Sequence, residues 1–75
     1  MTLSEGRIGA VYQVEQVMVK ESVARRLEAL GVNEKTKITV LNRKRRGASI
    51  IRVRGTRLAL GKPITDGILV KEAAE

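Results

Sequence analysis

The sequence contains no cysteine and no histidine among its 75 residues. Their absence excludes disulfide bonds, a thiolate nucleophile, an imidazole base and the usual nitrogen and sulfur ligands of transition metals. Only carboxylates remain as metal ligands, and the eight acidic residues are too scattered to form a calcium loop or a bridging carboxylate motif. The serines have no base that would activate them. We therefore expect no catalytic residue, no metal site and no bound cofactor, and the chain is not expected to be an enzyme.

Aromatic residues are almost absent too, since Tyr12 is the only one. With 43% hydrophobic residues the chain should still fold, around a core of Val, Ile and Leu that favours a small barrel. No apolar run approaches the roughly 20 residues of a membrane span, and the amino terminus lacks the pattern of a secretion signal. We expect one cytoplasmic domain over residues 1–75, with an ordered core over about residues 3–70.

What is plentiful is positive charge, with a formal net charge of +7. This charge attracts an acidic partner, which leaves nucleic acid, an anionic membrane surface and an acidic protein as alternatives. No glycine run matches a nucleotide-binding loop. The sequence Gly6-Arg7-Ile8-Gly9 has the spacing of a KH-domain loop, but a strand rather than a helix follows it. Charge alone does not choose among these partners.

One short amphipathic helix is predicted over residues 20–30, with Ser22 available as its N-cap and Gly31 as the residue that ends it. Three apolar residues at helical spacing form its stripe: Val23, Leu27 and Leu30. Because so short a helix is marginal in isolation, we expect its stripe to dock on a sheet.

Alternating apolar residues predict about five short strands in the rest of the chain, after a loop over residues 3–9. These strands are residues 10–17 with a bulge, residues 37–42, a third with Ile51 and Val53, a fourth with Leu58 and Leu60, and a last with Ile68 and Val70. Gly55-Thr56 is predicted to form a type II′ turn that pairs the third and fourth strands. Pro63 is expected to open a single helical turn. The pattern indicates a mostly β fold, a strongly bent, closed small barrel with one short α-helix packed on it.

Several segments occur together in a specific order and spacing. They are Arg26-Leu27, Leu30-Gly31-Val32, Ile38-Thr39-Val40-Leu41, Ile51-Arg52-Val53-Arg54-Gly55, Leu58-Ala59-Leu60 and Ile68-Leu69-Val70. Through them the chain resembles, over residues 3–70, the FeoA family, the small ferrous iron transport protein A of bacteria.

The resemblance implies an SH3-like barrel that acts as a cytoplasmic protein-binding regulator. Its implied partner is the cytosolic region of a membrane ferrous iron transport GTPase. A similar barrel is appended to iron-dependent repressors, but this chain has no room for their winged-helix DNA reader. A regulator needs no metal ligands, so we expect no tight binding of ferrous iron by the chain itself. Homo-oligomerisation and the direction of the regulatory effect stay open.

Five arginines are candidate contacts for such a partner: Arg25 and Arg26 on the helix, and Arg52, Arg54 and Arg57 around the predicted hairpin. The run Arg43-Lys44-Arg45-Arg46 extends the same cationic surface if the hairpin lies beside it. Alternatively these side chains form a solvated loop that guards an edge strand, or cover the barrel rim with their stems. The alternative function is a basic small barrel that binds nucleic acid, which the single aromatic residue disfavours.

Overall fold

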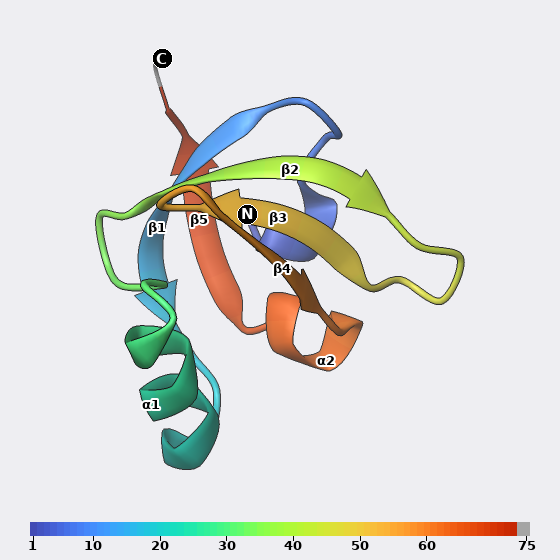
Figure 1. Ribbon diagram of the computed structural model, residues 1–75. Coiled ribbons are helices and arrows are strands. Elements are labelled where there is room, and N and C mark those ends of the chain that lie inside the picture. Colours follow the sequence, from blue (N-terminus) through green and yellow to red (C-terminus); the bar gives the residue numbers. More distant parts are fainter. Residues whose placement is uncertain (74–75) are drawn as a thin grey trace.

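The computed structural model describes residues 1–73 and shows one antiparallel sheet with short helices at its ends (Figure 1). In chain order the elements are the 3-10 helix η1 (Leu3–Glu5), β1 (Val11–Val17), α1 (Glu21–Ala29), β2 (Lys37–Arg43), β3 (Ser49–Val53), β4 (Thr56–Leu60), α2 (Lys62–Thr65) and β5 (Ile68–Glu72). The strand order is β4-β3-β2-β1-β5. The predicted class, a mostly β barrel of five strands with one short α-helix, is confirmed for the described residues.

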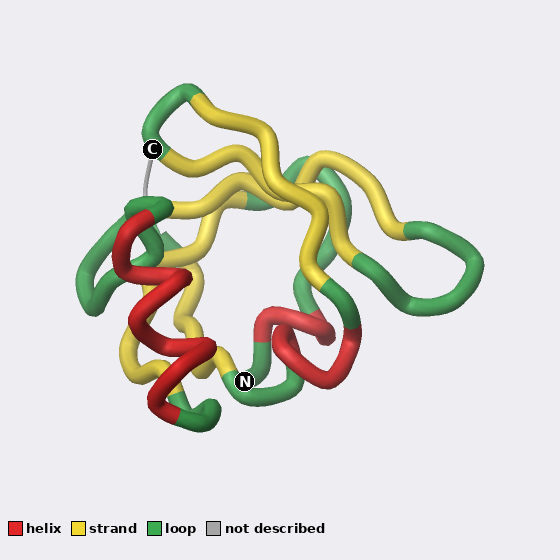
Figure 2. The backbone as a smooth tube through the Cα atoms, turned by 60° about the horizontal axis from the view of Figure 1, so that its bottom comes forward, coloured by secondary structure: helices red, strands yellow, loops and turns green. Residues whose placement is uncertain are grey.

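The sheet curls around a core built from alternate residues of every strand (Figure 2). Register shifts between Val14 and Gln16 and between Val40 and Asn42 mark irregularities in β1 and β2, and bulges of this kind bend strands. The first is the bulge expected from the imperfect alternation of the first strand. The core residues are Leu3, Tyr12, Val14, Leu27, Val32, Ile38, Val40, Ile51, Val53, Leu60, Ile68 and Val70. The hydroxyl of Tyr12 accepts a hydrogen bond from the Arg7 amide at 2.7 Å, so this buried phenol is satisfied.

The amino-terminal segment is more ordered than the predicted loop over residues 3–9. Leu3 is fully buried in the core, and η1 packs near β5 and α2. Met1 and Thr2 lie along the outer side of β5. The Val70 amide donates a hydrogen bond to the Met1 carbonyl at 2.8 Å, and Thr2 forms an isolated antiparallel β-bridge with Leu69. The prediction of a loop was wrong here because these contacts join sequence-distant segments, which local pattern does not reveal.

Helix α1 ends in a hydrogen-bonded reversal centred on Gly31, which has φ +97°. The Val32 amide donates to the Leu27 carbonyl at 2.8 Å and the Gly31 amide to the Glu28 carbonyl at 3.0 Å, the pattern of a Schellman motif. This reversal turns Val32 into the core beside Leu27 and leaves Leu30 41% exposed. The predicted stripe was therefore wrong at Leu30, whose place in the core is taken by a residue beyond the helix.

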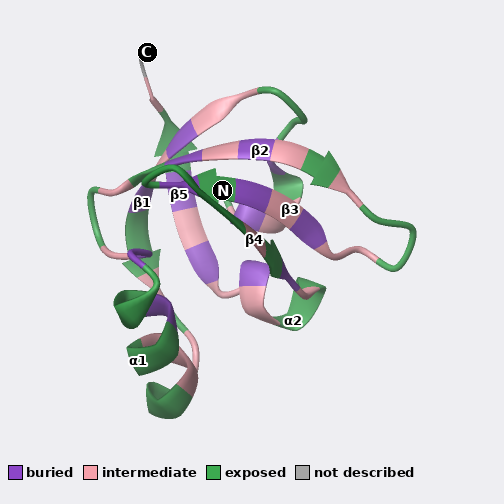
Figure 3. Cartoon of the chain, viewed as in Figure 1, coloured by how far each residue is buried: buried purple, intermediate pink, exposed green. Residues whose placement is uncertain are grey.

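The amino-terminal end of α1 also differs from the prediction. Lys20 is the N-cap, without a side-chain hydrogen bond, and Ser22 lies inside the first turn. Glu21 in that turn complements the helix dipole instead. Most of the helix surface is exposed, with Leu27 as its buried residue (Figure 3). The helix is thus held to the barrel mainly by its carboxyl-terminal half and the following reversal.

The hairpin between β3 and β4 turns at Arg54-Gly55, one residue earlier than predicted. Val53 pairs with Thr56, and both turn residues have positive φ, 53° at Arg54 and 77° at Gly55, as in a type I′ turn. Ile51 pairs with Leu58 and Ser49 with Leu60, whereas the predicted turn would place Val53 opposite Leu58 and Ile51 opposite Leu60. The prediction was wrong because arginine rarely occupies a left-handed position, so the single glycine was taken as the first turn residue.

The predicted helical turn at Pro63 is confirmed as α2, which carries the chain from β4 to β5. Within residues 1–73 no pairing joins β4 to β5, so the barrel is completed by α2 and η1 between these two edge strands. The following Gly67 allows a close approach, since a Cβ atom there would lie 2.5 Å from the Met18 carbonyl oxygen. One edge of the sheet is therefore covered by the amino terminus, and the other is β4.

Candidate protein-binding face

Two of the predicted partner residues, Arg52 and Arg57, lie directly opposite each other on β3 and β4. Both are exposed, and neither forms an ion pair with any residue of the described chain. Like charges directly opposite each other in a sheet are unfavourable. The pair concentrates positive charge on the outer face without a local structural benefit.

The third hairpin residue, Arg54, has a different environment because it lies in the turn. Its side chain extends over the end of α1, where a Cβ atom built on Gly31 would be 3.1 Å from Cδ of Arg54. A guanidinium near a helix carboxyl terminus also complements the helix dipole. Arg54 is exposed and also lies against the helix end, a contact that the sequence prediction did not include.

The helix arginines do not join this pair. Arg25 forms an exposed ion pair with Glu21 on its own helix, with 2.9 Å between Nη2 and Oε1. Arg26 is exposed near the end of α1. The structure therefore brings Arg52 and Arg57 together, places Arg54 between hairpin and helix, and leaves Arg25 and Arg26 on a separate element.

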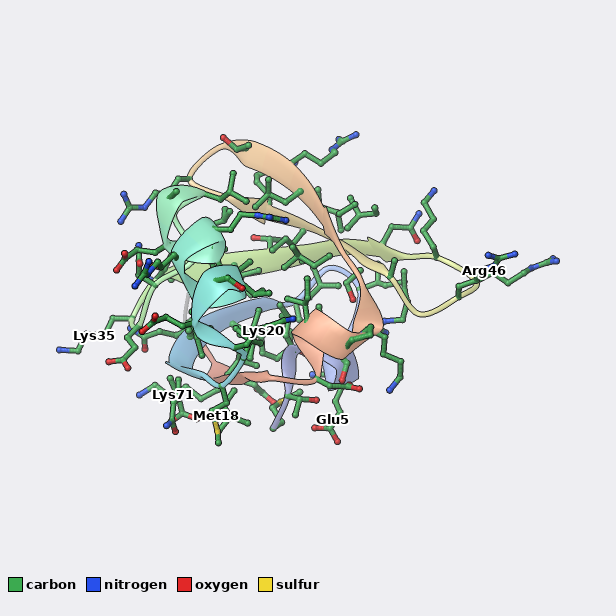
Figure 4. All side chains as sticks on the ribbon, turned by 90° about the horizontal axis from the view of Figure 1, so that it is seen from below. Glu5, Met18, Lys20, Lys35, Arg46 and Lys71 are labelled. Atoms are coloured by element: carbon green, nitrogen blue, oxygen red, sulfur yellow. The ribbon has the colours of Figure 1, made fainter. Side chains whose placement is uncertain are left out.

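The basic run at residues 43–46 splits into a structural and an exposed part. Arg43 ends β2 half-buried, and its guanidinium donates a hydrogen bond to the Gly6 carbonyl, which ties the strand to the amino-terminal segment. Lys44 and the two arginines after it are exposed, and Arg46 projects from the tip of the β2–β3 loop (Figure 4). Only the exposed part is available to a partner.

A shallow groove of about 340 Å³ lies beside the arginine pair on the outer side of the sheet. Its lining residues are Leu41, Asn42, Lys44, Ile50 and Arg57. Leu41 and Ile50 are half-buried, so the floor is apolar while Lys44 and Arg57 place cations at the rim. We call these five residues together with Arg52 the cationic face. Such a combination suits a surface that carries both apolar and acidic side chains.

The charge distribution along the sequence explains why the charges of this face are all positive. Sequence reasoning missed this distribution. Residues 35–65 contain ten of the fifteen Lys and Arg residues and none of the eight acids, a charge of +10. The rest of the sequence has five cations and eight acids, a charge of −3. The signal was readable as the acid-free interval between Glu34 and Asp66. Net charge alone concealed it, because the two regions partly cancel.

Two further observations concern metals and membranes. No group of three or more acidic side chains in residues 1–73 is placed to hold a metal ion. No helix in the same range is long and apolar enough to cross a membrane. The expectation that the chain does not bind ferrous iron tightly stays a prediction.

Comparison with known proteins assigns the fold to a family. The sequence profile of the FeoA domain matches residues 1–72. This chain belongs to the FeoA family. The match extends over β1 to β5 and includes both the cationic face and α1. The chain is therefore an SH3-like protein of the FeoA type, associated by family with ferrous iron transport.

Solved FeoA structures have the same architecture. The FeoA protein of Chlorobium tepidum is 31% identical, with a TM-score of 0.92 over 99% of this chain and 71% of that one. A FeoA described as an iron uptake regulatory protein is 27% identical, with a TM-score of 0.86 over 97% and 96% of the two chains. The FeoA of Stenotrophomonas maltophilia, an SH3 domain protein crystallised with zinc, is 28% identical, with a TM-score of 0.82 over 95% and 89%. A search of curated protein sequences gave no match.

The barrel is also present in larger regulators. A manganese-dependent transcriptional repressor contains it with a TM-score of 0.88 at 20% identity, over 97% of this chain and 41% of the repressor. At that identity the likeness concerns the fold alone.

Proposed function

We propose that this FeoA chain is a cytoplasmic protein-binding regulator that contacts the cytosolic region of a membrane ferrous iron transport GTPase. The observation that carries the proposal is the cationic face, which joins an apolar floor to unpaired arginines. Family membership supplies the connection to ferrous iron transport. In this role the chain contributes a binding surface and no chemistry of its own.

The unpaired charges of the face favour an interaction rather than a stabilising role. Arg25 and Lys62 lie in local ion pairs, with Glu21 and Asp66 respectively. Arg52 and Arg57 have no such acid among residues 1–73, and their guanidinium charges repel each other. A partner with acidic side chains removes that repulsion on binding, and exposed cations steer its approach.

Surface plasmon resonance tests the proposal directly. The purified chain is passed over the immobilised GTPase region in the nucleotide-free, GDP-bound and GTP-analogue-bound states, at two salt concentrations. We expect saturable binding in at least one state, with association slowed by salt. The proposal fails if no state binds the chain.

Nucleic acid is the competing partner and serves as the matched control. Duplex and single-stranded oligonucleotides are tested under the same conditions after nuclease treatment of the protein stock. Phosphate contacts produce a steep linear loss of log affinity with log salt. Tight oligonucleotide binding of this kind, without GTPase binding, selects the alternative function.

A further inference from the structure

The two edges of the sheet differ in a way that bears on how a partner is held. On β5 the outer backbone groups are used by the amino-terminal segment, through the bonds between Met1 and Val70. On β4 the outer side forms no backbone hydrogen bond with any residue of the range 1–73. An unpaired strand edge is a template for the addition of another strand.

The two-residue turn determines which groups of β4 are free. Residues that flank such a turn form a hydrogen-bonded pair, so Thr56, Leu58 and Leu60 direct their amides toward β3. The backbone groups of Arg57 and Ala59 therefore point away from the sheet. Both residues are exposed.

The side chains around this edge specify what an added strand would carry. On the outer face it would lie beside Arg57, whose cross-strand neighbour is Arg52, so carboxylates are favoured there. On the inner face it would lie beside Leu58, which is half-buried at the margin of the core. Alternate residues of a strand face opposite sides, so acidic residues would alternate with apolar ones.

We infer that β4 binds an extended acidic segment of a partner protein by strand addition, with carboxylates beside Arg57, to whose positive charge Arg52 on β3 adds, and apolar side chains at Leu58. The inference rests on the proposed function, because it names the part of the partner that the cationic face holds. A second copy of this chain fits poorly, since pairing β4 with β4 would bring two +10 regions together. Nucleic acid offers no regular row of backbone donors and acceptors for Arg57 and Ala59.

Amide hydrogen exchange followed by NMR tests the inference on the intact chain. In the free protein the Arg57 and Ala59 amides should exchange fast, whereas the Leu58 amide between them is bonded to β3. When the GTPase region is present at a saturating concentration, we expect the Arg57 and Ala59 amides to exchange at least about tenfold more slowly. The exchange rate of the Leu58 amide should change less. Binding without protection of these two amides overturns strand addition and leaves the proposed function standing.

A second probe separates the inference from the identity of the partner. It is a blocked peptide in which Val alternates with Glu, compared with one in which Val alternates with Gln. The Glu peptide should protect the Arg57 and Ala59 amides and bind at least tenfold more tightly. If neither peptide protects them, or if the free chain protects them only as it dimerises at high concentration, the inference is wrong. Absence of GTPase binding with peptide protection retained would refute the proposed partner alone.

Two variants complete the design. Ala59→Pro removes an outward amide while leaving the β3 pairing intact, as edge strands tolerate. This variant should bind the Glu peptide at least tenfold more weakly than the wild type does. Lys71→Glu reverses a charge on the opposite edge strand, away from β4, and should leave peptide binding unchanged. If Ala59→Pro binds as the wild type does, the outward amide of Ala59 is not used and the inference fails.

Discussion

The outer surfaces of residues 35–65 and of the remaining residues use their polar groups differently. In the remainder, some exposed groups have local partners, such as Arg25 with Glu21 and Glu5 with Thr2, and the amino terminus covers an edge strand. Residues 35–65 contain no acid that could pair with Arg52 and Arg57, and the outer edge of β4 forms no backbone hydrogen bond within residues 1–73. The comparison separates surface contacts that stabilise the fold from the cationic face and the β4 edge, which are left for a partner.

This separation predicts two independent kinds of variant. Changes to the stabilising contacts should lower the free energy of unfolding and leave partner affinity nearly unchanged in the folded fraction. Changes on the cationic face should lower affinity and leave unfolding nearly unchanged.

Leu27→Ala should lower the free energy of unfolding by roughly 2–5 kcal/mol, because it empties the one buried position of α1. Chemical denaturation measures the loss. Leu30→Ala is the matched control on the same helix, since Leu30 is 41% exposed and should change stability by at most about 0.5 kcal/mol. Equal losses at the two positions would show that the docking of α1 is misassigned.

Reversing charge at the pair, with Arg52→Glu and Arg57→Glu together, should weaken binding of the GTPase region about tenfold or more, about 1.4 kcal/mol. The effect should fall mainly on association and should reduce its salt dependence. Lys20→Glu with Lys71→Glu makes the same change in total charge on the other region, where Figure 4 labels both lysines. Equal weakening by the two double variants would mean that total charge, rather than the cationic face, steers binding.

Arg54→Asn should raise the free energy of unfolding by about 0.5 kcal/mol, because Asn-Gly is the favoured type I′ turn and arginine is strained at φ 53°. The gain is partly offset by loss of the contact between Arg54 and Gly31. Thermal and chemical denaturation measure the net change. A loss of stability instead would assign Arg54 to the stabilising contacts, as a residue that holds α1 to the hairpin.

The sequence was sufficient for most of the fold because local rules set it. Alternating Val, Ile and Leu marked the strands, Gly31 marked the end of α1, and Pro63 marked α2. The prediction was wrong where the local structure depends on a contact between distant residues or on a residue with a strained backbone. Leu30 lost its core position to Val32 through the reversal at Gly31, and the hairpin turn included an arginine that propensity disfavours.

The candidate site was predictable only in part. Arg52 and Arg57 were chosen for their charge, but strand register was needed to show that they face each other. The structural role of Arg43, and the contact of Arg54 with α1, depend on elements far apart in the chain. The covered edge of β5 could not be foreseen, because nothing in residues 1–5 resembles a strand.

The smallest effect concerns Glu5, which holds the segment that covers β5. Its carboxylate accepts a hydrogen bond from the Thr2 amide at 2.8 Å and another from the Thr2 hydroxyl at 3.2 Å. These two bonds hold the pKa of Glu5 below its ordinary value of 4.5. A lowered pKa means that Glu5 contributes stability above pH 4.5, and that this contribution is lost as pH falls through the folded-state pKa.

Glu5→Gln should therefore abolish a small acid-dependent loosening of the amino-terminal cover. The readout is exchange of the Val70 amide, which bonds to the Met1 carbonyl, compared between wild type and variant at neutral pH and at about pH 3. We expect the wild-type protection of Val70 to approach that of the variant in acid. If the two proteins differ equally at both pH values, the ionised carboxylate of Glu5 does not hold the cover. The closure of this edge would then rest on the backbone bonds of Met1 and Thr2 alone.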